Sequence, residues 1–386
     1  MRLDGFSAAQ RAHVVRAKSG YNAFVPPPLP PAVELSHALA RRLSSADRAL
    51  GELAGMARTI ANPALLSQTM MRREAVLSSR IEGTRSSLSD LVLFEVERPT
   101  GAASDDAREV FNYLAALDHL IAPGRRFPVS LPLLKEAHAL LFDGVRGAST
   151  ATPGDFRRSQ NWIGASGSLL ADAAYVPPPP EQMWSALDAF EKYLHADHEL
   201  PPLLTLAAVH YQFEAIHPFL DGNGRIGRLL VILLLVEWGI LPAPVLDVSA
   251  YIEPRRDRYY DGLLKVSTQG DWPTWFAFFL EIVEEQARDA VRRAARLQAL
   301  RDDYRARVAT VGSSGLLGLL VDEVFRVPGL TIGRAQEVLG VTHRTAALNI
   351  EKLVKAGVLV ELAGHARPRL FIASGILDVL DGAGAD

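Results

Sequence analysis

The chain has 386 residues, of which 48% are hydrophobic and 22% are charged, and its formal net charge is −3. This length allows two or three domains, and the composition is typical of a soluble globular protein. The small net charge gives no general attraction to nucleic acid or to anionic membranes. The absence of cysteine excludes disulfides, thiolate metal sites and a cysteine nucleophile, and agrees with an expected cytoplasmic location.

The N-terminal segment and the longest apolar run both argue against membrane association. The first 20 residues mix charges throughout and lack an apolar core, so we expect no secretory signal peptide. The longest apolar run, Leu229–Val236, is too short to span a bilayer. It predicts a helix that is buried on all sides. We therefore expect no membrane partner.

Residues 1–104 are predicted to form an N-terminal helical region with a proline-rich arm. Phe24–Pro31 contains five prolines, which favour an extended, polyproline-like strap packed on the protein rather than a free docking site. Apolar residues at helical spacing predict a helix within 33–60, which Asn62-Pro63 ends. A second helix is predicted at about 63–83.

The end of this second helix combines a hydroxyl, a carboxylate and a glycine. Ser78 and Glu82 are four residues apart and so lie on one helix face, and Gly83 is suited to end the helix. By itself this pattern is also that of an ordinary surface glutamate beside a C-terminal glycine.

The middle of the chain, residues 105–280, is predicted to be a mainly helical core. Two short β-type runs, within Pro153–Gly164 and Ala173–Pro180, are joined through Gly164–Gly167 and predict a hairpin. Hydrophobic spacing predicts helices at 105–122, 131–143, 184–195 and 202–216.

The segment His217–Arg228 holds an imidazole, a carboxylate, three glycines and two arginines in front of the apolar helix. Gly222, Asn223 and Gly224 tolerate backbone conformations that turn N–H groups inward. We expect these groups to meet the N-terminus of a helix that starts near Arg225, where free donors and the helix dipole favour phosphate.

The charged side chains of this segment suit phosphate chemistry. Arg225 and Arg228 are three residues apart and could hold phosphate oxygens from one helix face. Asp221 offers hard oxygen ligands for a Mg²⁺ that bridges phosphates. His217 titrates near neutral pH and can take a proton from an attacking hydroxyl.

These twelve residues resemble the complete motif of the Fic family, His-Pro-Phe-x-Asp/Glu-Gly-Asn-Gly-Arg-x-x-Arg, with every fixed position present. The resemblance implies a mainly α fold: a Fic-type helical core with a β-hairpin flap. It also implies a protein adenylyltransferase, an enzyme that transfers AMP from ATP to a Tyr, Thr or Ser hydroxyl of a target protein and releases diphosphate. Mg²⁺ is the implied cofactor.

The resemblance also implies a role for each matching residue. His217 would be the catalytic base, and Asp221 would hold the metal. Tyr260 would form the wall against the adenine, although core packing is equally natural for a tyrosine. The implied ATP-binding residues are Ala173, Ala174, Tyr175, Asp221, Gly222, Asn223, Gly224, Arg225, Gly227, Arg228 and Tyr260.

Ser78, Glu82 and Gly83 match the Ser/Thr-x-x-x-Glu-Gly/Asn pattern of the inhibitory helix in this family. The implied function is that Glu82 occupies Arg228, so that the γ-phosphate of ATP loses its anchor and the enzyme is autoinhibited. Removal of AMP by the same site stays open as an alternative direction, since Glu82 could also orient a water.

The implied partners are proteins. A target would dock on the flap by strand addition, the protein would also label itself, and a homodimer is in keeping with the family. The target, the acceptor residue and the preferred nucleotide stay open.

Residues 281–314 are predicted to be a charge-rich linker helix, and residues 315–386 resemble a winged helix-turn-helix domain. Helices are predicted at Leu316–Phe325, Thr331–Gly340 and His343–Ala356, and strands at Val358–Leu362 and Arg369–Ile372.

A DNA-binding role of this last domain would use Arg344, Asn349 and Lys352 in the major groove and Arg367 in the wing. However, residues 315–386 carry seven Lys/Arg and eight Asp/Glu, so little surplus charge is left to neutralise phosphates. Binding to DNA is therefore not favoured. The rival hypothesis is a DNA-binding transcriptional regulator whose core only senses nucleotide.

Overall fold

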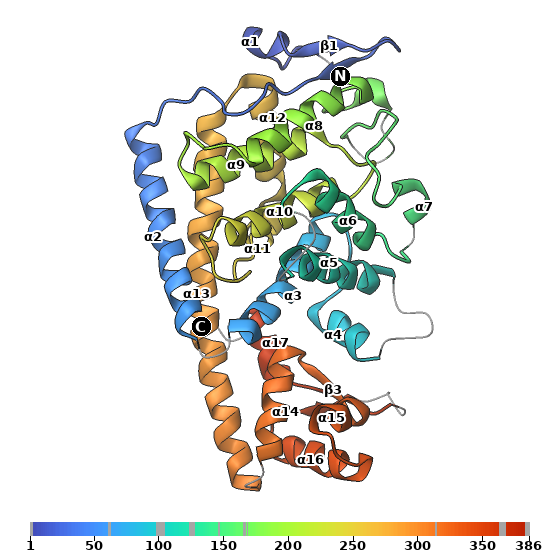
Figure 1. Cartoon of the computed structure of the whole chain (residues 1–386), viewed down its shortest axis with the longest axis vertical. Helices are drawn as coiled ribbons and strands as arrows, with labels where there is room; N and C mark the ends of the chain where they lie inside the picture. Colours follow the sequence, from blue (N-terminus) through green and yellow to red (C-terminus); the bar gives the residue numbers. More distant parts are fainter. Residues whose placement is uncertain are drawn as a thin grey trace.

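The computed structural model of the chain describes residues 3–60, 63–97, 105–122, 128–145, 147–164, 167, 169–312, 315–362 and 368–382. The fold is mainly helical, as predicted, with small antiparallel sheets (Figure 1). Within these ranges no helix is both long enough and apolar enough to cross a membrane.

The helices up to the end of the predicted core follow the hydrophobic spacing closely. Those at 63–81 and 202–216 have the expected bounds, whereas α4 was not predicted. In chain order they are α1 Ala8–Arg11, α2 His37–Thr59, α3 Pro63–Ile81, α4 Leu88–Glu97, α5 Asp105–Ile121, α6 Leu131–Leu141, α7 Ala148–Ala151, α8 Pro180–Leu194, α9 Pro202–Ile216, α10 Asn223–Glu237, α11 Ser249–Ile252 and α12 Arg256–Gln269.

Helices α9 and α10 form the centre of the core. Every residue of α9 from Leu203 to Ile216 is buried, and in α10 the run Ile226–Leu235 is buried. The prediction of a helix buried on all sides is therefore confirmed. Trp275 closes one side of this pair, because its indole N–H donates to the Ala207 carbonyl oxygen at 2.9 Å.

The longest element is α13, Trp272–Val311, which runs along the molecule beside α2 (Figure 1). This helix of 40 residues spans the predicted boundary between the core, 105–280, and the linker helix, 281–314. Its buried side chains extend from Trp275 to Val308, so the helix is packed along its length.

The C-terminal elements pack against the far end of α13 and α3 (Figure 1). The three predicted helices and both predicted strands are present, but β3 and α17 were not predicted. The strands form an antiparallel sheet in the order β3-β5-β4. The predicted wing residue Arg367 lies outside the described residues. The elements are α14 Gly315–Arg326, β3 Gly329–Thr331, α15 Ile332–Leu339, α16 His343–Lys355, β4 Val360–Glu361, β5 Leu370–Ile372 and α17 Ser374–Asp381.

Helix α3 is held on several sides. Its Arg72 forms a bidentate ion pair with Glu95 of α4, with two N–O distances of 2.7 Å. Its Glu74 is buried and accepts hydrogen bonds from the Tyr113 hydroxyl of α5 and from the Ser249 hydroxyl and backbone N–H of α11. The C-terminal end of α3 is thereby fixed next to α10.

The predicted flap is confirmed at one residue pair only. Ile163 and Tyr175, one from each predicted run, form an isolated antiparallel bridge, and residues 170–172 between the two runs form a short 3-10 helix. A small hairpin that was not predicted is formed by β1 Val14–Arg16 and β2 Asn22–Phe24. It contacts the second run of the predicted flap, because the Phe24 N–H donates to the Val176 carbonyl oxygen.

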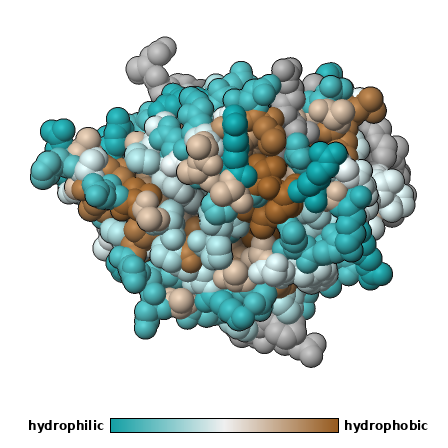
Figure 2. All heavy atoms as spheres, turned by 90° about the horizontal axis from the view of Figure 1, so that it is seen from above, coloured by the Kyte–Doolittle hydropathy of each residue, from teal (hydrophilic) through white to brown (hydrophobic). Residues whose placement is uncertain are grey.

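Apolar side chains are exposed near the flap. Trp162, Ile163, Leu169 and Trp184 are among the large hydrophobic residues with high exposure. The end of the molecule that carries α1 and β1 also shows apolar patches between hydrophilic side chains (Figure 2).

The contact between β3 and α4 gives a test of how the C-terminal elements join the rest of the chain. A Cβ atom at Gly329 would lie 2.6 Å from Val92 Cγ1 and 2.9 Å from Val96 Cγ2. We expect Gly329→Ala to lower the free energy of unfolding by about 1–3 kcal/mol through overpacking, measured by urea denaturation. Gly318→Ala is the control, because nothing lies within 4 Å of its Cβ position. Equal stability of Gly329→Ala and the unaltered protein would contradict this packing.

Candidate functional site

His217 lies directly after α9 in an unusual backbone conformation. Its φ of 51° and ψ of 59° are left-handed, which is rare outside glycine. Its Nδ1 lies 3.2 Å from the Glu214 carbonyl oxygen. Because a carbonyl can only accept, Nδ1 carries the proton and Nε2 is left with its lone pair. This is the tautomer that a base needs.

The environment keeps the imidazole neutral. Burial lowers the pKa of His217 to about 4, and the nearby Arg157 guanidinium acts in the same direction. The hydrogen bond to the Glu214 carbonyl and the carboxylates of Glu82 and Asp221 raise the pKa and oppose this shift in part. At neutral pH the Nε2 lone pair is therefore available.

The loop after His217 is locked by amide side chains. Asn223 accepts from the Phe219 N–H and donates to the Phe219 carbonyl oxygen, both at 2.8 Å. Asn161 donates to the same carbonyl at 2.7 Å. The Asn223 side chain therefore shapes the loop, and a contribution of its backbone N–H to phosphate binding stays a prediction.

The N-terminus of α10 offers a place for an anion. Gly222 precedes the helix with φ 79°, and no side chain caps the first N–H groups. Asn223 and Gly224 are helical, so only Gly222 uses the left-handed conformation expected for all three. Free N–H groups at a helix start favour negative charge.

A carboxylate of the protein itself lies at this helix start. A Cβ atom at Gly224 would be 2.4 Å from Glu82 Oε1, so glycine is needed for the carboxylate to come this close. Glu82 follows α3 directly, and Gly83 has φ 107°, which turns the chain away. The Glu82 carboxylate thus takes a position in which a phosphate oxygen would be favoured.

Arg228 lies under the same carboxylate and is fully buried. Its Nη2 donates to Glu82 Oε1 at 2.7 Å and to the Ser78 carbonyl oxygen at 3.0 Å, and its Nε donates to Ser78 Oγ at 2.8 Å. Its Nη1 is buried without a hydrogen-bond partner. One donor of this guanidinium is therefore free for a further acceptor.

The charges of this pair reinforce one another. Burial by itself would raise the pKa of Glu82, but Arg228 outweighs burial and the pKa is lowered. Burial by itself would lower the pKa of Arg228, and the Glu82 carboxylate instead raises it. Both groups are charged at neutral pH.

Arg225 has other partners than Arg228. It is buried, its Nη1 donates to Glu109 at 3.1 Å, and its guanidinium lies over the Phe142 ring at 5.1 Å. The two side chains diverge toward α5 and α3, and a joint hold of both arginines on phosphate oxygens stays a prediction. The Asp221 side chain, by contrast, is 69% exposed beside the helix start.

The two tyrosines predicted to bind ATP, Tyr175 and Tyr260, have different environments. The Tyr175 hydroxyl donates to the Ala215 carbonyl oxygen at 2.7 Å and its ring is buried, so its side chain cannot face a nucleotide. Ala173 is buried and Ala174 is exposed. Tyr260 is 42% exposed, and burial together with Glu82 raises the pKa of its phenol to about 12. Tyr260 thus lies close enough to Glu82 to sense its charge.

Gly227 serves helix packing. A Cβ atom there would lie 2.2 Å from Glu214 Oε1 and 3.3 Å from the His210 ring. The Gly227 carbonyl oxygen also lies 3.2 Å from His210 Nδ1. The close approach of α9 and α10 explains the small residue, and its role in binding ATP stays a prediction.

Sequence reasoning missed several polar side chains of the site. Glu109 pairs with Arg225, and Glu214 is buried with an unpartnered Oε1. His138 stacks on the Phe219 ring at 3.8 Å, and its Nε2 lies 3.1 Å from the Asp221 carbonyl oxygen. Glu214 could have been noticed, because a charged residue within an apolar helix just before His217 is unusual.

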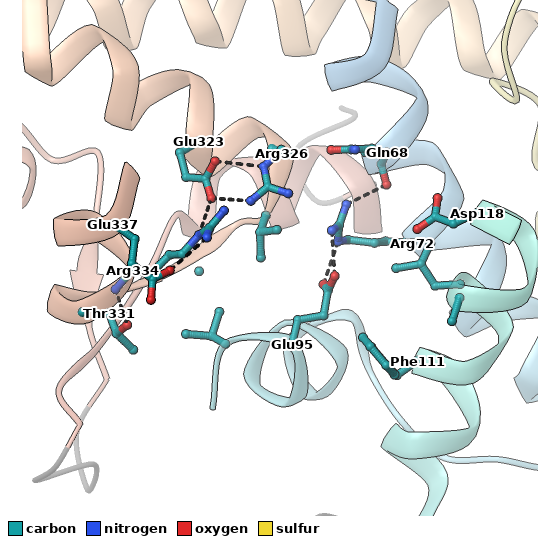
Figure 3. A pocket seen from close by; sticks show the side chains of 16 residues that line it. Gln68, Arg72, Glu95, Phe111, Asp118, Glu323, Arg326, Thr331, Arg334 and Glu337 are labelled. Atoms are coloured by element: carbon teal, nitrogen blue, oxygen red, sulfur yellow. Dashed lines mark hydrogen bonds and ion pairs between the residues drawn. The ribbon is translucent and has the colours of Figure 1, made fainter. Parts of the chain in front are cut away.

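A separate cavity of about 680 Å³ lies between α3, α4 and α5 on one side and α14, β3 and α15 on the other (Figure 3). Arg72 on one wall is paired with Glu95, and Arg326 and Arg334 on the other wall are paired with Glu323. Because these guanidinium groups have carboxylate partners, the cavity offers little unpaired positive charge for a triphosphate.

Two family models match the chain where these contacts occur. Residues 40–121 match the model described as Fic/DOC family N-terminal, and residues 128–235 match the Fic/DOC family model. The chain is therefore similar to the Fic/DOC family over these two regions. His217, Asp221 and Arg228 lie within the second match, and Ser78 and Glu82 lie within the first.

Curated relatives of the Fic/DOC region carry the name protein adenylyltransferase Fic. The protein from Drosophila yakuba is 28% identical over 191 residues, which are 48% of this chain and 34% of the relative. The protein from Drosophila melanogaster is 27% identical over the same length and shares. The chain thus spans about a third of the length of the curated relatives it matches.

Solved structures show the same fold. A Fic family protein from Desulfovibrio desulfuricans G20 aligns with a TM-score of 0.59 and 20% identity over 89% of this chain and 98% of that one. Fic-1 from C. elegans aligns with a TM-score of 0.52 and 20% identity over 66% of this chain and 73% of that one. The Fic-type helical core is therefore confirmed.

Glu214 gives a test of site electrostatics that does not depend on activity. Burial raises its pKa from 4.5 to about 8, with Arg228 opposing and Glu82 assisting. Between these pH values the folded protein holds a proton that the unfolded chain releases, so stability falls as pH rises. The free energy of unfolding of Glu214→Gln minus that of the unaltered protein should therefore increase by about 1–3 kcal/mol between about pH 5 and about pH 8.

Urea denaturation at the two pH values measures this difference. The exposed Glu52 provides the matched control, since Glu52→Gln should give the same difference at both. A pH-independent difference for Glu214→Gln would show that Glu214 is ionised in the folded protein.

Proposed function

We propose that this protein is an adenylyltransferase that transfers AMP from ATP to a Tyr, Thr or Ser hydroxyl of a target protein. The names of the curated relatives support this reaction, and the complete segment His217–Arg228 provides the residues for it. The observation that carries the proposal is the pairing of Glu82 with Arg228 at the start of α10. A carboxylate held there marks a site built for an anion.

The reaction needs a base, and His217 is suited to be one. The neutral imidazole accepts the hydroxyl proton at Nε2 while the hydroxyl oxygen attacks the α-phosphorus of ATP. The new O–P bond forms as the bond between the α-phosphorus and the bridging oxygen breaks, and diphosphate leaves with the electron pair. The N–H groups at the start of α10 and the Arg228 guanidinium stabilise the developing charge by position and electrostatics.

Asp221 is a fitting residue to hold Mg²⁺ together with the phosphates. Among the described residues no three His, Asp or Glu side chains gather into a metal-binding group. One exposed carboxylate is nevertheless enough, because Mg²⁺ usually takes one or two carboxylates, substrate phosphates and waters. When bound, the ion would supply positive charge to the diphosphate leaving group.

The contact between Glu82 and Arg228 is proposed to inhibit the enzyme. Arg228 is the only residue of the proposed γ-phosphate anchor, and two of its nitrogens already serve Ser78 and Glu82. A triphosphate would meet a carboxylate of the same sign at the helix start. The reverse reaction stays an alternative, because Glu82 could orient a water toward an AMP-protein bond.

We expect Glu82→Gly to raise self-labelling by about tenfold or more. The substitution removes a carboxylate whose buried ion pair with Arg228 has an energy of several kcal/mol, and Arg228 is then free to bind phosphate. Incorporation of label from α-labelled ATP, with Mg²⁺, measures this. Glu82→Gln, which keeps the shape without the charge, should give an intermediate rate.

The double variant Glu82→Gly/His217→Ala separates the base from the inhibition. We expect it to bind ATP but to incorporate no label. Equal labelling of Glu82→Gly and the unaltered protein would refute the inhibition, and label in the double variant would refute the base.

The C-terminal elements are proposed to be a winged-helix domain that binds protein rather than DNA. Asn349, expected at the bases in the DNA hypothesis, is buried and donates to the Thr345 carbonyl oxygen at 2.9 Å. The exposed face of α16 carries Leu348 and Glu351 besides Arg344. We propose a division into residues 1–104, 105–280, 281–314 and 315–386, with α13 shared by the second and third parts, and a homodimer as the assembly.

Salt dependence distinguishes this proposal from a DNA-binding regulator. A protein that neutralises six or more phosphates loses roughly 10³-fold in affinity between about 50 and 200 mM salt. We expect weak retention on duplex DNA with a nearly flat salt response, and no change in Arg344→Ala/Lys352→Ala. A steep salt response that this double variant abolishes would favour the DNA-binding regulator.

A further inference from the structure

A buried arginine joins the flap to the catalytic loop. Arg157 is completely buried, and none of the described carboxylates forms an ion pair with it. Its guanidinium donates to four backbone carbonyl oxygens instead: Nε to His217 at 2.9 Å, Nη2 to Pro178 at 2.6 Å and to Ile216 at 3.4 Å, and Nη1 to Ser159 at 3.2 Å. Its own backbone N–H donates to the Pro218 carbonyl oxygen at 2.9 Å.

The place of this cation has a physical reason. Ile216 and His217 end α9, and their carbonyl oxygens carry the negative end of the helix dipole, where a cation is favoured. Burial lowers the pKa of Arg157 to about 10, with Tyr175 and Tyr21 acting in the opposite direction, so the group stays charged at neutral pH. A buried charge is retained only where it is well satisfied, and here backbone oxygens satisfy it.

The contacts converge on a residue whose backbone is strained. His217 is left-handed, which costs a residue with a side chain of order 1 kcal/mol or more. Its carbonyl oxygen accepts from Arg157 Nε and from Asn161 Nδ2, the latter at 3.4 Å. Since Pro178 and Ser159 flank the Ile163–Tyr175 bridge, the same guanidinium also ties the flap to this carbonyl.

We propose that Arg157 is a positioning residue that fixes the His217 imidazole through the His217 carbonyl and couples the imidazole to the flap. This inference rests on the proposed function for its catalytic consequence. Arg157 reaches the reaction only through His217.

The charge of Arg157 has a second consequence for the base. The groups that act on the imidazole are Arg157, which lowers its pKa together with burial, and the Glu214 carbonyl, Glu82 and Asp221, which raise it. Removal of the guanidinium charge therefore raises the pKa of His217. The acidic limb of the pH–rate profile should then move to higher pH.

The test compares Arg157→Met, Arg157→Lys and Arg158→Met, each in the Glu82→Gly protein. Methionine keeps much of the buried volume without the charge, and lysine keeps the charge without the planar guanidinium and its several donors. Arg158 is the exposed neighbour that serves as control. We expect Arg157→Met to lower kcat about 10- to 100-fold with KM for ATP nearly unchanged, since a small misplacement of a catalytic group has this cost. Lysine should restore the pH profile but only part of kcat.

A second readout is independent of activity. The imidazole signal of His217, identified by its loss in His217→Ala, is titrated by NMR in the full chain with and without Arg157→Met. We expect the midpoint to move to higher pH in Arg157→Met and to stay in place in Arg158→Met. Thermal unfolding of each variant establishes that the folded protein is compared, and Arg157→Lys serves if Arg157→Met does not fold.

The outcomes separate the two claims. A normal kcat, an unchanged pH profile and an unmoved His217 titration in Arg157→Met would overturn the positioning role, as would equal losses in Arg158→Met. If the Glu82→Gly protein incorporates no label, the proposed function fails, and the NMR titration still decides whether Arg157 controls His217.

Discussion

The buried guanidinium of Arg228 is the constraint on which the rest of the site depends. A charge with no exposed surface needs a partner, and in this protein Ser78 and Glu82 at the end of α3 provide it. The carboxylate cannot reach Arg228 without lying against the start of α10, where Gly224 makes room for it. The same contact that satisfies the arginine therefore fills the place that suits a phosphate.

Three buried arginines around one loop are satisfied in three different ways. Arg228 pairs with the end of α3, Arg225 pairs with Glu109 under the Phe142 ring, and Arg157 uses backbone carbonyls alone. Each solution leaves a different chemical property. The ion pair of Arg228 breaks when the Glu82 carboxylate moves away. Arg225 is a fixed part of the loop, and Arg157 holds the strained backbone of His217 in place.

Helix α3 connects this site with the C-terminal elements. Its last residues meet Arg228, Glu74 binds α5 and α11, and Arg72 binds α4 beside the cavity of Figure 3. Both α14 and α17 pack on α3 as well. Helix α3 is thus in contact both with Arg228 and with the C-terminal elements.

The sequence by itself determined what depends on local spacing: the bounds of α3 and α9, the buried run of α10 and the order of the C-terminal helices. The meeting of Glu82 with Arg228 was implied only by the resemblance to the Fic family. Tertiary structure alone decided which way side chains point and which distant groups they meet. The Tyr175 side chain points into the core, Arg225 pairs with Glu109, and Asn223 forms hydrogen bonds within its own loop. Helix α13 continues across a predicted boundary. The physical reason is that helical periodicity is a property of neighbouring residues, whereas a buried polar group is satisfied by whatever partner the fold brings to it.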